Sequence, residues 1–246
     1  MKYLIQISFL LLSITTLANT SNFEIANEAY KEGNFNNAIE LYESLLENGE
    51  NSDVRYNLAN AYFKTGRFPA AILNYEKALK LNPTDKDIAY NLQIANMQLK
   101  DKIEATPEFF LLTWWKQFAK KQTANRWTVM FLTFLWLGIG LFLLFALTNL
   151  TIKKPIFFGG CGSLLIAFFL LMLALTQHQY ETKDNGAIIM TASVSVKSEP
   201  LSTGKDLFII HSGLKVTILK KEQDWYNIQL ADGKEGWIKE DALAKI

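Results

Sequence analysis

Two long stretches without a charged residue constrain this chain more than any other feature of its sequence. The first runs from Trp127 to Leu147 and the second from Ile156 to Thr176, and neither contains Lys, Arg, Asp, Glu or His. At about 1.5 Å per residue, a helix of either length crosses a hydrocarbon layer of ~30 Å. Neither stretch shows the polar stripe that a buried helix of a soluble domain presents. We therefore predict transmembrane helices at residues 127–148 and 156–177.

The segment between these helices, residues 149–155, is too short to be a domain. The two helices therefore form a hairpin, which places the chain before it and the chain after it on one side of the membrane. We assign the loop to the cytoplasm and both flanking parts to the exported side. The distribution of positive charge argues against this orientation, because Lys and Arg normally gather in cytoplasmic loops. The loop carries only two of these residues, whereas the flank before the first helix carries Lys116, Lys120, Lys121 and Arg126.

The N-terminus predicts export. Lys2 precedes an apolar stretch that ends at Leu17, and Ala18 is a small residue suited to a cleavage site. We interpret residues 1–18 as a cleaved signal peptide. An uncleaved anchor is the competing interpretation, because Gln6 interrupts the apolar stretch. Either segment exports the residues that follow it, and we give this more weight than the loop charges.

Charge and motif content exclude several classes of function. The net charge of +1 supplies no basic surface for nucleic acid, so we predict no nucleic-acid partner. The one cysteine, Cys161, lies in the second apolar stretch and cannot form a disulfide within the chain. The sequence shows no nucleophile–base pair, phosphate-binding loop or metal-binding motif. We predict no catalytic, cofactor-binding or metal-binding residues, and hence a protein that is not an enzyme.

A self-similar segment, residues 22–103, precedes the membrane helices. The residues from Tyr30 align with those from Phe63 at an offset of 33, which matches Gly33 with Gly66. Small residues let antiparallel helices approach closely, Gly reaches a left-handed turn without a Cβ penalty, and Pro83 ends the second copy. The pattern resembles the tetratricopeptide repeat. That resemblance implies an all-α solenoid of about two and a half repeats, capped by a helix from about residue 85 to residue 100.

Repeats of this family present a concave groove that binds a peptide or a partner helix. Each candidate groove residue has an alternative interpretation as an ordinary solvated helix surface. The resemblance assigns partner binding to the following residues: Asn27, Tyr30, Lys31, Tyr56, Asn60, Phe63 and Lys64. The groove would continue onto the capping helix through Tyr90, Ile94 and Met97.

Residues 107–126 combine aromatic and basic side chains directly before the first membrane helix. A Trp ring can be buried at a water–lipid boundary while its N–H stays hydrated, and Lys can reach anionic headgroups. We predict a helix that lies on the membrane surface. The alternative is a linker helix packed on the repeat domain.

A β-rich segment, residues 187–246, follows a polar linker at residues 178–186. Apolar residues alternate there with a period of two, and Asp232-Gly233 is a strong hairpin signal. The order of these motifs resembles the bacterial SH3 domain, which implies an all-β, SH3-like small barrel that recognises peptides or cell-wall polymers. Trp225, Tyr226 and Trp237 are the candidate ligand-binding residues, and packing in the core is the alternative for the tryptophans.

The order of all these segments resembles the BatE family of the aerotolerance (Bat) operon. The resemblance covers essentially the whole chain and implies a two-pass protein of the bacterial inner membrane, with both soluble domains in the periplasm. It also implies partnership with other Bat membrane proteins, which carry von Willebrand factor A domains, in oxygen-stress tolerance or envelope maintenance.

From the sequence we therefore expect a multidomain membrane protein that acts as a periplasmic scaffold. The repeat groove would bind a protein partner, and the SH3 domain would bind a peptide or peptidoglycan. An envelope sensor is the alternative: the SH3 domain would detect cell-wall fragments and signal through the hairpin. The short loop argues against the sensor, because it leaves little surface for a cytosolic receiver.

Overall fold

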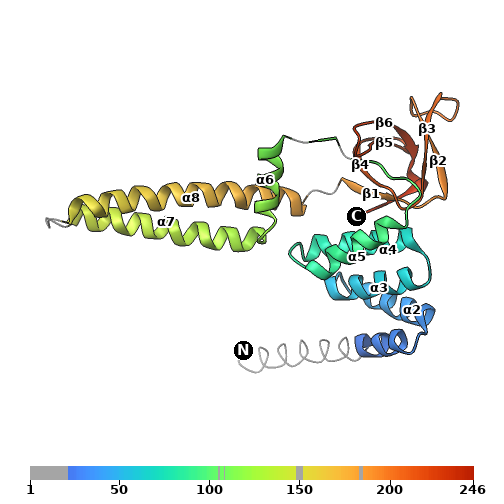
Figure 1. Cartoon of the computed structure of the whole chain (residues 1–246), viewed down its shortest axis with the longest axis horizontal. Helices are drawn as coiled ribbons and strands as arrows, with labels where there is room; N and C mark the ends of the chain where they lie inside the picture. The colour runs from blue at the N-terminus through green and yellow to red at the C-terminus, as the bar shows by residue number, and fades with distance from the viewer. Residues whose placement is uncertain (1–21, 105, 108, 148–151, 183–184) are drawn as a thin grey trace, which may run out of the picture. The chain divides into compact units, whose positions relative to one another are not determined.

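The computed structural model describes residues 22–104, 106–107, 109–147, 152–182 and 185–246 (Figure 1). The expected signal peptide and residues 149–151 of the expected loop lie outside these ranges. The chain divides into two compact units. The first consists of Met1–Thr106 and Asp184–Ile246, and the second of Pro107–Lys183.

The first unit begins with paired helices. Residues 22–31 are helical and precede α2 (Phe35–Leu46), and α3 (Ser52–Lys64) precedes α4 (Phe68–Leu81). Both connecting turns pass through a glycine with positive φ, +82° at Gly33 and +74° at Gly66. A residue with a Cβ is strained in that conformation, which explains why the repeat carries Gly there. The last helix is α5 (Lys86–Met97), shorter than the expected span of residues 85–100.

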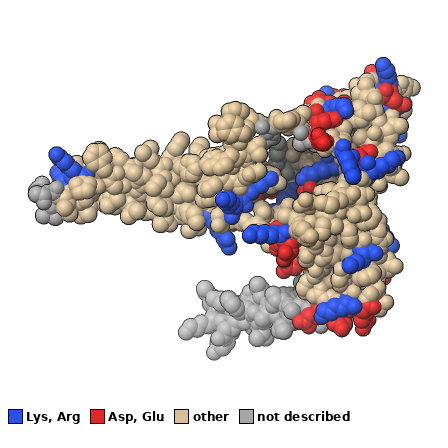
Figure 2. Space-filling model, viewed as in Figure 1, with Lys and Arg blue, Asp and Glu red and all other residues tan. Residues whose placement is uncertain are grey.

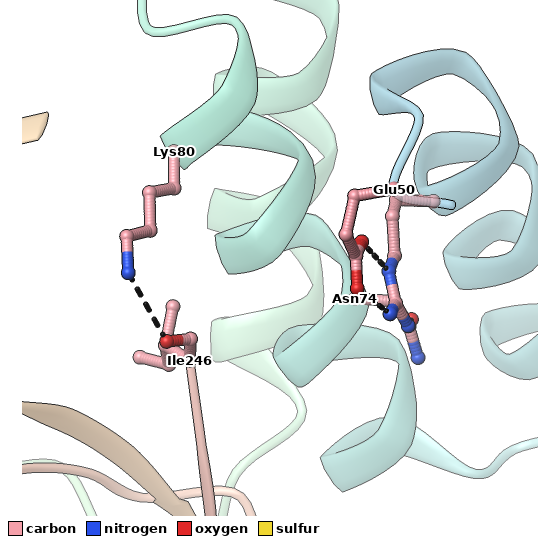
Figure 3. A network of polar contacts seen from close by, with 5 residues as sticks. Glu50, Asn74, Lys80 and Ile246 are labelled. Carbon is pink, nitrogen blue, oxygen red and sulfur yellow. Dashed lines mark hydrogen bonds and ion pairs between the residues drawn. The ribbon is translucent and has the colours of Figure 1, made fainter. Parts of the chain in front are cut away.

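Small residues bring these helices together, as the repeat pattern predicts. Ala26, Ala38, Ala59 and Ala71 have no exposed surface. The side chains of Asn51 and Asp85 accept hydrogen bonds from backbone N–H groups at the start of α3 and α5, and so cap these helices. Arg55 of α3 donates to both Glu50 carboxylate oxygens and to the side chain of Asn74 of α4, which stands beside Glu50 in Figure 3.

The C-terminal part of the first unit is a seven-stranded antiparallel sheet. Its strands, in chain order, are β1 (Gly186–Ile189), β2 (Ser193–Lys197), β3 (Asp206–His211), β4 (Lys215–Glu222), β5 (Trp225–Gln229), β6 (Glu235–Lys239) and β7 (Leu243–Lys245). Their order in the sheet is β3-β2-β6-β5-β4-β1-β7. The turn between β5 and β6 contains Gly233 at φ +86°, as the Asp-Gly pair predicts.

The helices and the sheet share a core. Ile188 of β1 is fully buried in a cluster with Ile72 of α4 and Leu92 of α5, and Ile246 packs against the same cluster. Lys80 of α4 points toward Ile246 and donates to its backbone oxygen at 3.3 Å (Figure 3). The β-rich segment therefore covers the end of the helical repeat, where a further helix would otherwise be needed to bury these side chains.

The segment that leaves α5 also holds the two parts together. Asp101 accepts hydrogen bonds from the His211 backbone N–H at 2.6 Å and pairs with the His211 ring at 2.8 Å. Ile103 packs against the core of the sheet, and the Thr106 N–H donates to the Ala231 oxygen at 3.1 Å. The segment crosses the sheet as a strap and contributes a side chain to its core.

The second unit contains α6 (Phe110–Ala119), α7 (Ala124–Leu147) and α8 (Lys153–Thr182). The helices α7 and α8 are both long and apolar enough to span a membrane, with a mean hydropathy of 2.4. Figure 2 shows their surface almost free of charged side chains except at the two ends. Phe142 of α7 lies against Gly160 of α8. Gly138, one turn earlier in α7, lies against Leu164, one turn later in α8, so the two helices run antiparallel.

The bounds of these helices differ from the sequence-based ones in several places, and α7 begins at Ala124, three residues before the predicted start. The expected linker at residues 178–186 is helical up to Thr182, because it contains no helix breaker there and because Gln177 and Thr182 bond to residues one turn away. At its other end α8 begins before Pro155, which the first turn of a helix tolerates. The expected surface helix at residues 107–126 is represented by the shorter α6.

Candidate functional site

The candidate groove residues lie on the first helix of each repeat. Asn27, Tyr30 and Lys31 come from the helix at residues 22–31, and the remaining four come from α3. Lys31 and Lys64 are exposed, whereas the Asn, Tyr and Phe side chains of the set are half-buried. The exposed members are therefore available to a partner, and the others contact neighbouring helices.

Tyr30 and Phe63 each pair with an aromatic ring across the turn inside their own repeat. The Tyr30 ring lies 5.3 Å from the Phe35 ring at 64°, and the Phe63 ring lies 5.4 Å from the Phe68 ring at 63°. Such edge-to-face pairs are a favourable arrangement of aromatic rings. Because the same pair recurs in both repeats, these two candidates have a packing role in the repeat.

Asn27 and Asn60 occupy the centre of a repeating hydrogen-bond ladder. In the first repeat the Asn27 side-chain oxygen accepts from the Tyr42 hydroxyl at 2.7 Å and from the Asn57 amide at 3.0 Å. In the second repeat the Asn60 oxygen accepts from the Tyr75 hydroxyl at 2.5 Å and from the Asn91 amide at 3.1 Å. Each rung thus joins both helices of one repeat to the first helix of the next.

The ladder also involves Tyr56 and is largely buried. The Asn91 amide donates to the Tyr56 hydroxyl at 2.9 Å. Burial raises the pKa of Tyr42 from 10.0 to about 12, and burial also raises the pKa of Tyr75. Both hydroxyls therefore remain protonated donors at neutral pH. Asn57 and Asn91 are not among the binding residues predicted from the sequence, although both belong to the Tyr-Asn-Leu motif that recurs at Tyr56 and Tyr90.

The exposed part of this surface continues onto α5. Tyr90 is 64% exposed and Met97 is 60% exposed. Large apolar side chains at this exposure are available to contact a partner. The helical repeat therefore exposes apolar side chains on α5 in addition to Lys64 and to Lys31, which pairs with Glu28 at 3.5 Å.

In the sheet, the three candidate ligand-binding aromatics have different environments. Tyr226 and Trp237 are only 2% and 7% exposed. The Tyr226 hydroxyl donates to Glu240 at 2.8 Å, and the Lys220 ammonium lies 4.7 Å from the centroid of the Trp237 ring. Trp225 is half-buried and is the candidate whose ring lines an open surface.

Trp225 lines two adjoining clefts, of about 310 and 520 Å³. Ser202, Lys239 and Asp241 line both clefts, and Ser202 belongs to the long loop between β2 and β3. Lys221 donates a hydrogen bond to Glu240 and lowers the pKa of that carboxyl, so the rim stays charged at neutral pH. An aromatic face between a cation and carboxylates can hold a peptide that carries charges of both signs.

Among the described residues, no group of three or more His, Cys, Asp or Glu side chains could hold a metal ion. The surface of the helical repeat and the Trp225 clefts are lined by amides, ammonium groups, carboxylates and aromatic rings, which can form hydrogen bonds, ion pairs and apolar contacts with a ligand.

Comparison with known protein families identifies two modules. Residues 52–85 match the family model of the tetratricopeptide repeat, and residues 192–244 match that of the bacterial SH3 domain. The first match covers α3 and α4, and the second covers the sheet from β2 onward. No curated protein matches the chain. The chain carries a tetratricopeptide repeat and a bacterial SH3 domain, modules that indicate binding to proteins and to the cell wall.

Proposed function

We propose that this protein is a membrane-anchored periplasmic adaptor that holds a protein partner in its helical repeat and a peptide or cell-wall ligand on its SH3 domain. In this proposal α7 and α8 span the bacterial inner membrane, and both soluble domains lie in the periplasm. The helices form a solenoid, and the sheet forms an SH3-like small barrel. The adaptor performs no catalysis and is not an enzyme.

The shared core of the two modules supports the adaptor role best. Because Ile188 of β1 completes the core of α4 and α5, the repeat surface and the Trp225 clefts belong to one compact unit. A ligand on one surface is then held at a fixed distance from a ligand on the other. Fixed spacing between two binding surfaces is what an adaptor provides.

The order of the modules and the resemblance to the BatE family support the finer assignment. We propose that the protein partner is another Bat membrane protein with a von Willebrand factor A domain, in a complex for oxygen-stress tolerance or envelope maintenance. The exposed Lys31 and Lys64 suit an acidic segment of that partner, and Tyr90 and Met97 suit its apolar residues.

The charge reversal Lys31→Glu/Lys64→Glu tests the repeat surface. Both side chains are exposed, so the substitution leaves the helical core intact. Pull-down from membranes with this variant should lose the protein partner, whereas the control Lys205→Glu/Lys234→Glu, with the same charge change at exposed positions of the SH3 domain, should retain it. Equal recovery of the partner by both variants would contradict the proposed surface.

Trp225→Ala tests the SH3 surface. We expect weaker co-sedimentation with purified peptidoglycan, because the ring lines both clefts. Leu219→Ala is the matched control, since Leu219 is 45% exposed on β4 and lines neither cleft. A signalling defect in Trp225→Ala with every partner still bound would favour the sensor over the adaptor.

Topology is tested separately with reporter fusions after Lys102 and at Ile246. Both fusions should report the periplasm. A cytoplasmic signal from either one would overturn the proposed location.

A further inference from the structure

The helix α6 carries more apolar surface than its contact with the hairpin covers. Trp115, Phe118 and Ala119 pack with Trp127 of α7 and with α8. On a helix that turns about 100° per residue, Trp114 lies to one side of this packed face and Leu112 to the other. These flanks are exposed, 55% for Trp114 and 55% for Leu112, and Phe110 beside Trp114 is 69% exposed.

The residues of α8 that contact α6 belong to its apolar stretch. The Trp115 ring lies 5.2 Å from the Phe169 ring, and Leu170, Leu173 and Ala174 belong to the same buried cluster. Phe169 precedes Thr176, the end of that stretch, by about 10 Å of helix at ~1.5 Å per residue. Half of a hydrocarbon layer is about 15 Å thick. Once α8 spans the membrane, the packed face of α6 therefore lies at the depth of the hydrocarbon of one leaflet, while its polar side faces the headgroups.

The Trp115 and Trp127 indole N–H groups and the Ala124 N–H at this junction are bonded inside the protein, whereas the buried Gln177 side-chain oxygen has no partner among the described residues. The Trp115 indole N–H donates to the Thr176 hydroxyl at 3.0 Å, and the Trp127 indole N–H donates to the Ala119 oxygen at 2.8 Å. The Ala124 N–H, at the start of α7, donates to the Glu181 carboxylate at 3.1 Å. Since unpaired polar groups are costly in hydrocarbon, these bonds allow the Trp115 and Trp127 rings to lie in lipid.

A ring of basic residues follows α6, and we call Lys120, Lys121 and Arg126 the basic collar. Lys120 lies 4.2 Å from the centroid of the Tyr180 ring, and Lys121 lies 5.3 Å from that of Phe118. Arg126 donates to the neutral Gln122 side chain at 3.1 Å. No carboxylate pairs with these three cations among the residues that the structure describes. The collar therefore presents cations that no described carboxylate neutralises beside the exposed apolar flanks.

We propose that α6 and the basic collar form a binding site for acidic phospholipids, in the leaflet that holds the start of α7 and the end of α8. The acyl chains contact the exposed flanks of α6, and the headgroup phosphates bind the collar. The continuity of the α6 flanks with the apolar surface of the hairpin favours lipid over a soluble partner as the occupant. This site rests on the proposed membrane insertion of α7 and α8.

The depth of α6 is measured with nitroxide labels on the full chain in lipid bilayers. Cys161 is the only cysteine, so Cys161→Ala gives a background for Leu112→Cys on a flank of α6, Gln117→Cys on its polar side and Leu143→Cys on α7. Collision with oxygen, which is concentrated in lipid, is compared with collision with a water-soluble nickel chelate. We expect the label at residue 112 to behave like that at residue 143, and the label at residue 117 to collide more with nickel.

Each other outcome has a separate meaning. Oxygen access at residue 143 with nickel access at residue 112 refutes the lipid site and leaves the membrane anchor intact. Nickel access at residue 143 refutes membrane insertion itself. A label at residue 112 that is shielded from both reagents means that protein, a second copy or a partner helix, covers the flank, and this also refutes the lipid site.

Headgroup selectivity is measured with spin-labelled phosphatidylglycerol and phosphatidylcholine as competing probes. Each Lys or Arg near an acidic headgroup contributes about fivefold in association. The variant Lys120→Gln/Lys121→Gln/Arg126→Gln should therefore lose at least about fivefold of its preference for phosphatidylglycerol. Lys153→Gln/Lys154→Gln at the other end of the hairpin is the control and should leave the collar contribution unchanged. A collar variant with the wild-type preference would overturn the proposal.

Discussion

Replacing Asn60 by Ala removes the central acceptor of the second rung of the ladder. Asn60→Ala leaves the Tyr75 hydroxyl, on a side chain that is 2% exposed, without its acceptor. A buried donor without a partner costs about 1–3 kcal/mol. Asn91 loses a bond of about 1 kcal/mol but keeps the one to Tyr56, and the higher helix propensity of Ala returns about 0.5 kcal/mol. We expect a net loss of about 2–3 kcal/mol in the free energy of unfolding of the repeat.

Hydrogen exchange of the full chain in detergent micelles measures this loss locally. Amide protection in α3 and α4 should fall by roughly a hundredfold, which corresponds to about 2.8 kcal/mol. Strands of the sheet far from the ladder serve as the internal reference. The measurement also shows whether Asn60→Ala is suitable as a binding variant, since a loss of partner would then reflect a loosened repeat.

A double-mutant cycle tests the physical reason. Tyr75→Phe removes the donor, so Asn60→Ala in that background no longer leaves a buried hydroxyl unpaired. The double variant should be more stable than the sum of the single losses predicts, by about 1 kcal/mol or more. Additive losses, or a loss below about 0.5 kcal/mol in Asn60→Ala alone, would refute the ladder as a stabilising element.

Three further substitutions probe the first unit. Gly213→Ala should lower the free energy of thermal unfolding by about 2 kcal/mol, because residue 213 has φ +90° and the alanine Cβ would lie 2.3 Å from Leu99 Cδ2. An unchanged melting temperature would contradict this. Ile103→Ala should cost about 2 kcal/mol and lower exchange protection in the sheet but not in α2; equal losses in both would argue against the strap. Because the pKa of Tyr42 is about 12 in the folded protein and 10.0 otherwise, its stabilising effect is complete below pH ~10 and is lost as the pH rises toward ~12. Tyr42→Phe should therefore show a smaller alkaline loss of stability than the wild type, and an identical loss would refute the assignment.

The helical repeat could be predicted because its constraints are local in sequence. Gly33 and Gly66 mark turns that need positive φ, and the buried alanines recur at the same offset. The ladder could not be predicted in the same way, because its bonds join three helices whose relative rotation follows only from packing. The motif containing Asn57 and Asn91 indicated a repeated helix, not a hydrogen bond across repeats.

The aromatic residues of the sheet show a similar division. Neighbouring residues of a strand face opposite sides, so the sequence already implied that Trp225 and Tyr226 could not both be exposed on one face. Trp237 pairs with Asn227, which lies two residues after Trp225, so Trp237 and Trp225 are on the same face of the sheet. Trp237 is nevertheless buried. Trp237 is covered by Lys220, which comes from another strand. Which residues of other strands cover a side chain depends on the register of the sheet, and the sequence pattern of one strand does not give that register.

Residue 192, where the bacterial SH3 match begins, falls after β1. A gene fragment that begins at that boundary would encode a sheet without the strand that carries Ile188 and Ile189. The remaining fragment would keep that strand but lose β4 and β7, the strands that pair with it. Truncations meant to separate the two modules would then report misfolding and degradation in place of lost binding. Point substitutions at surface positions are the sound way to dissect this chain.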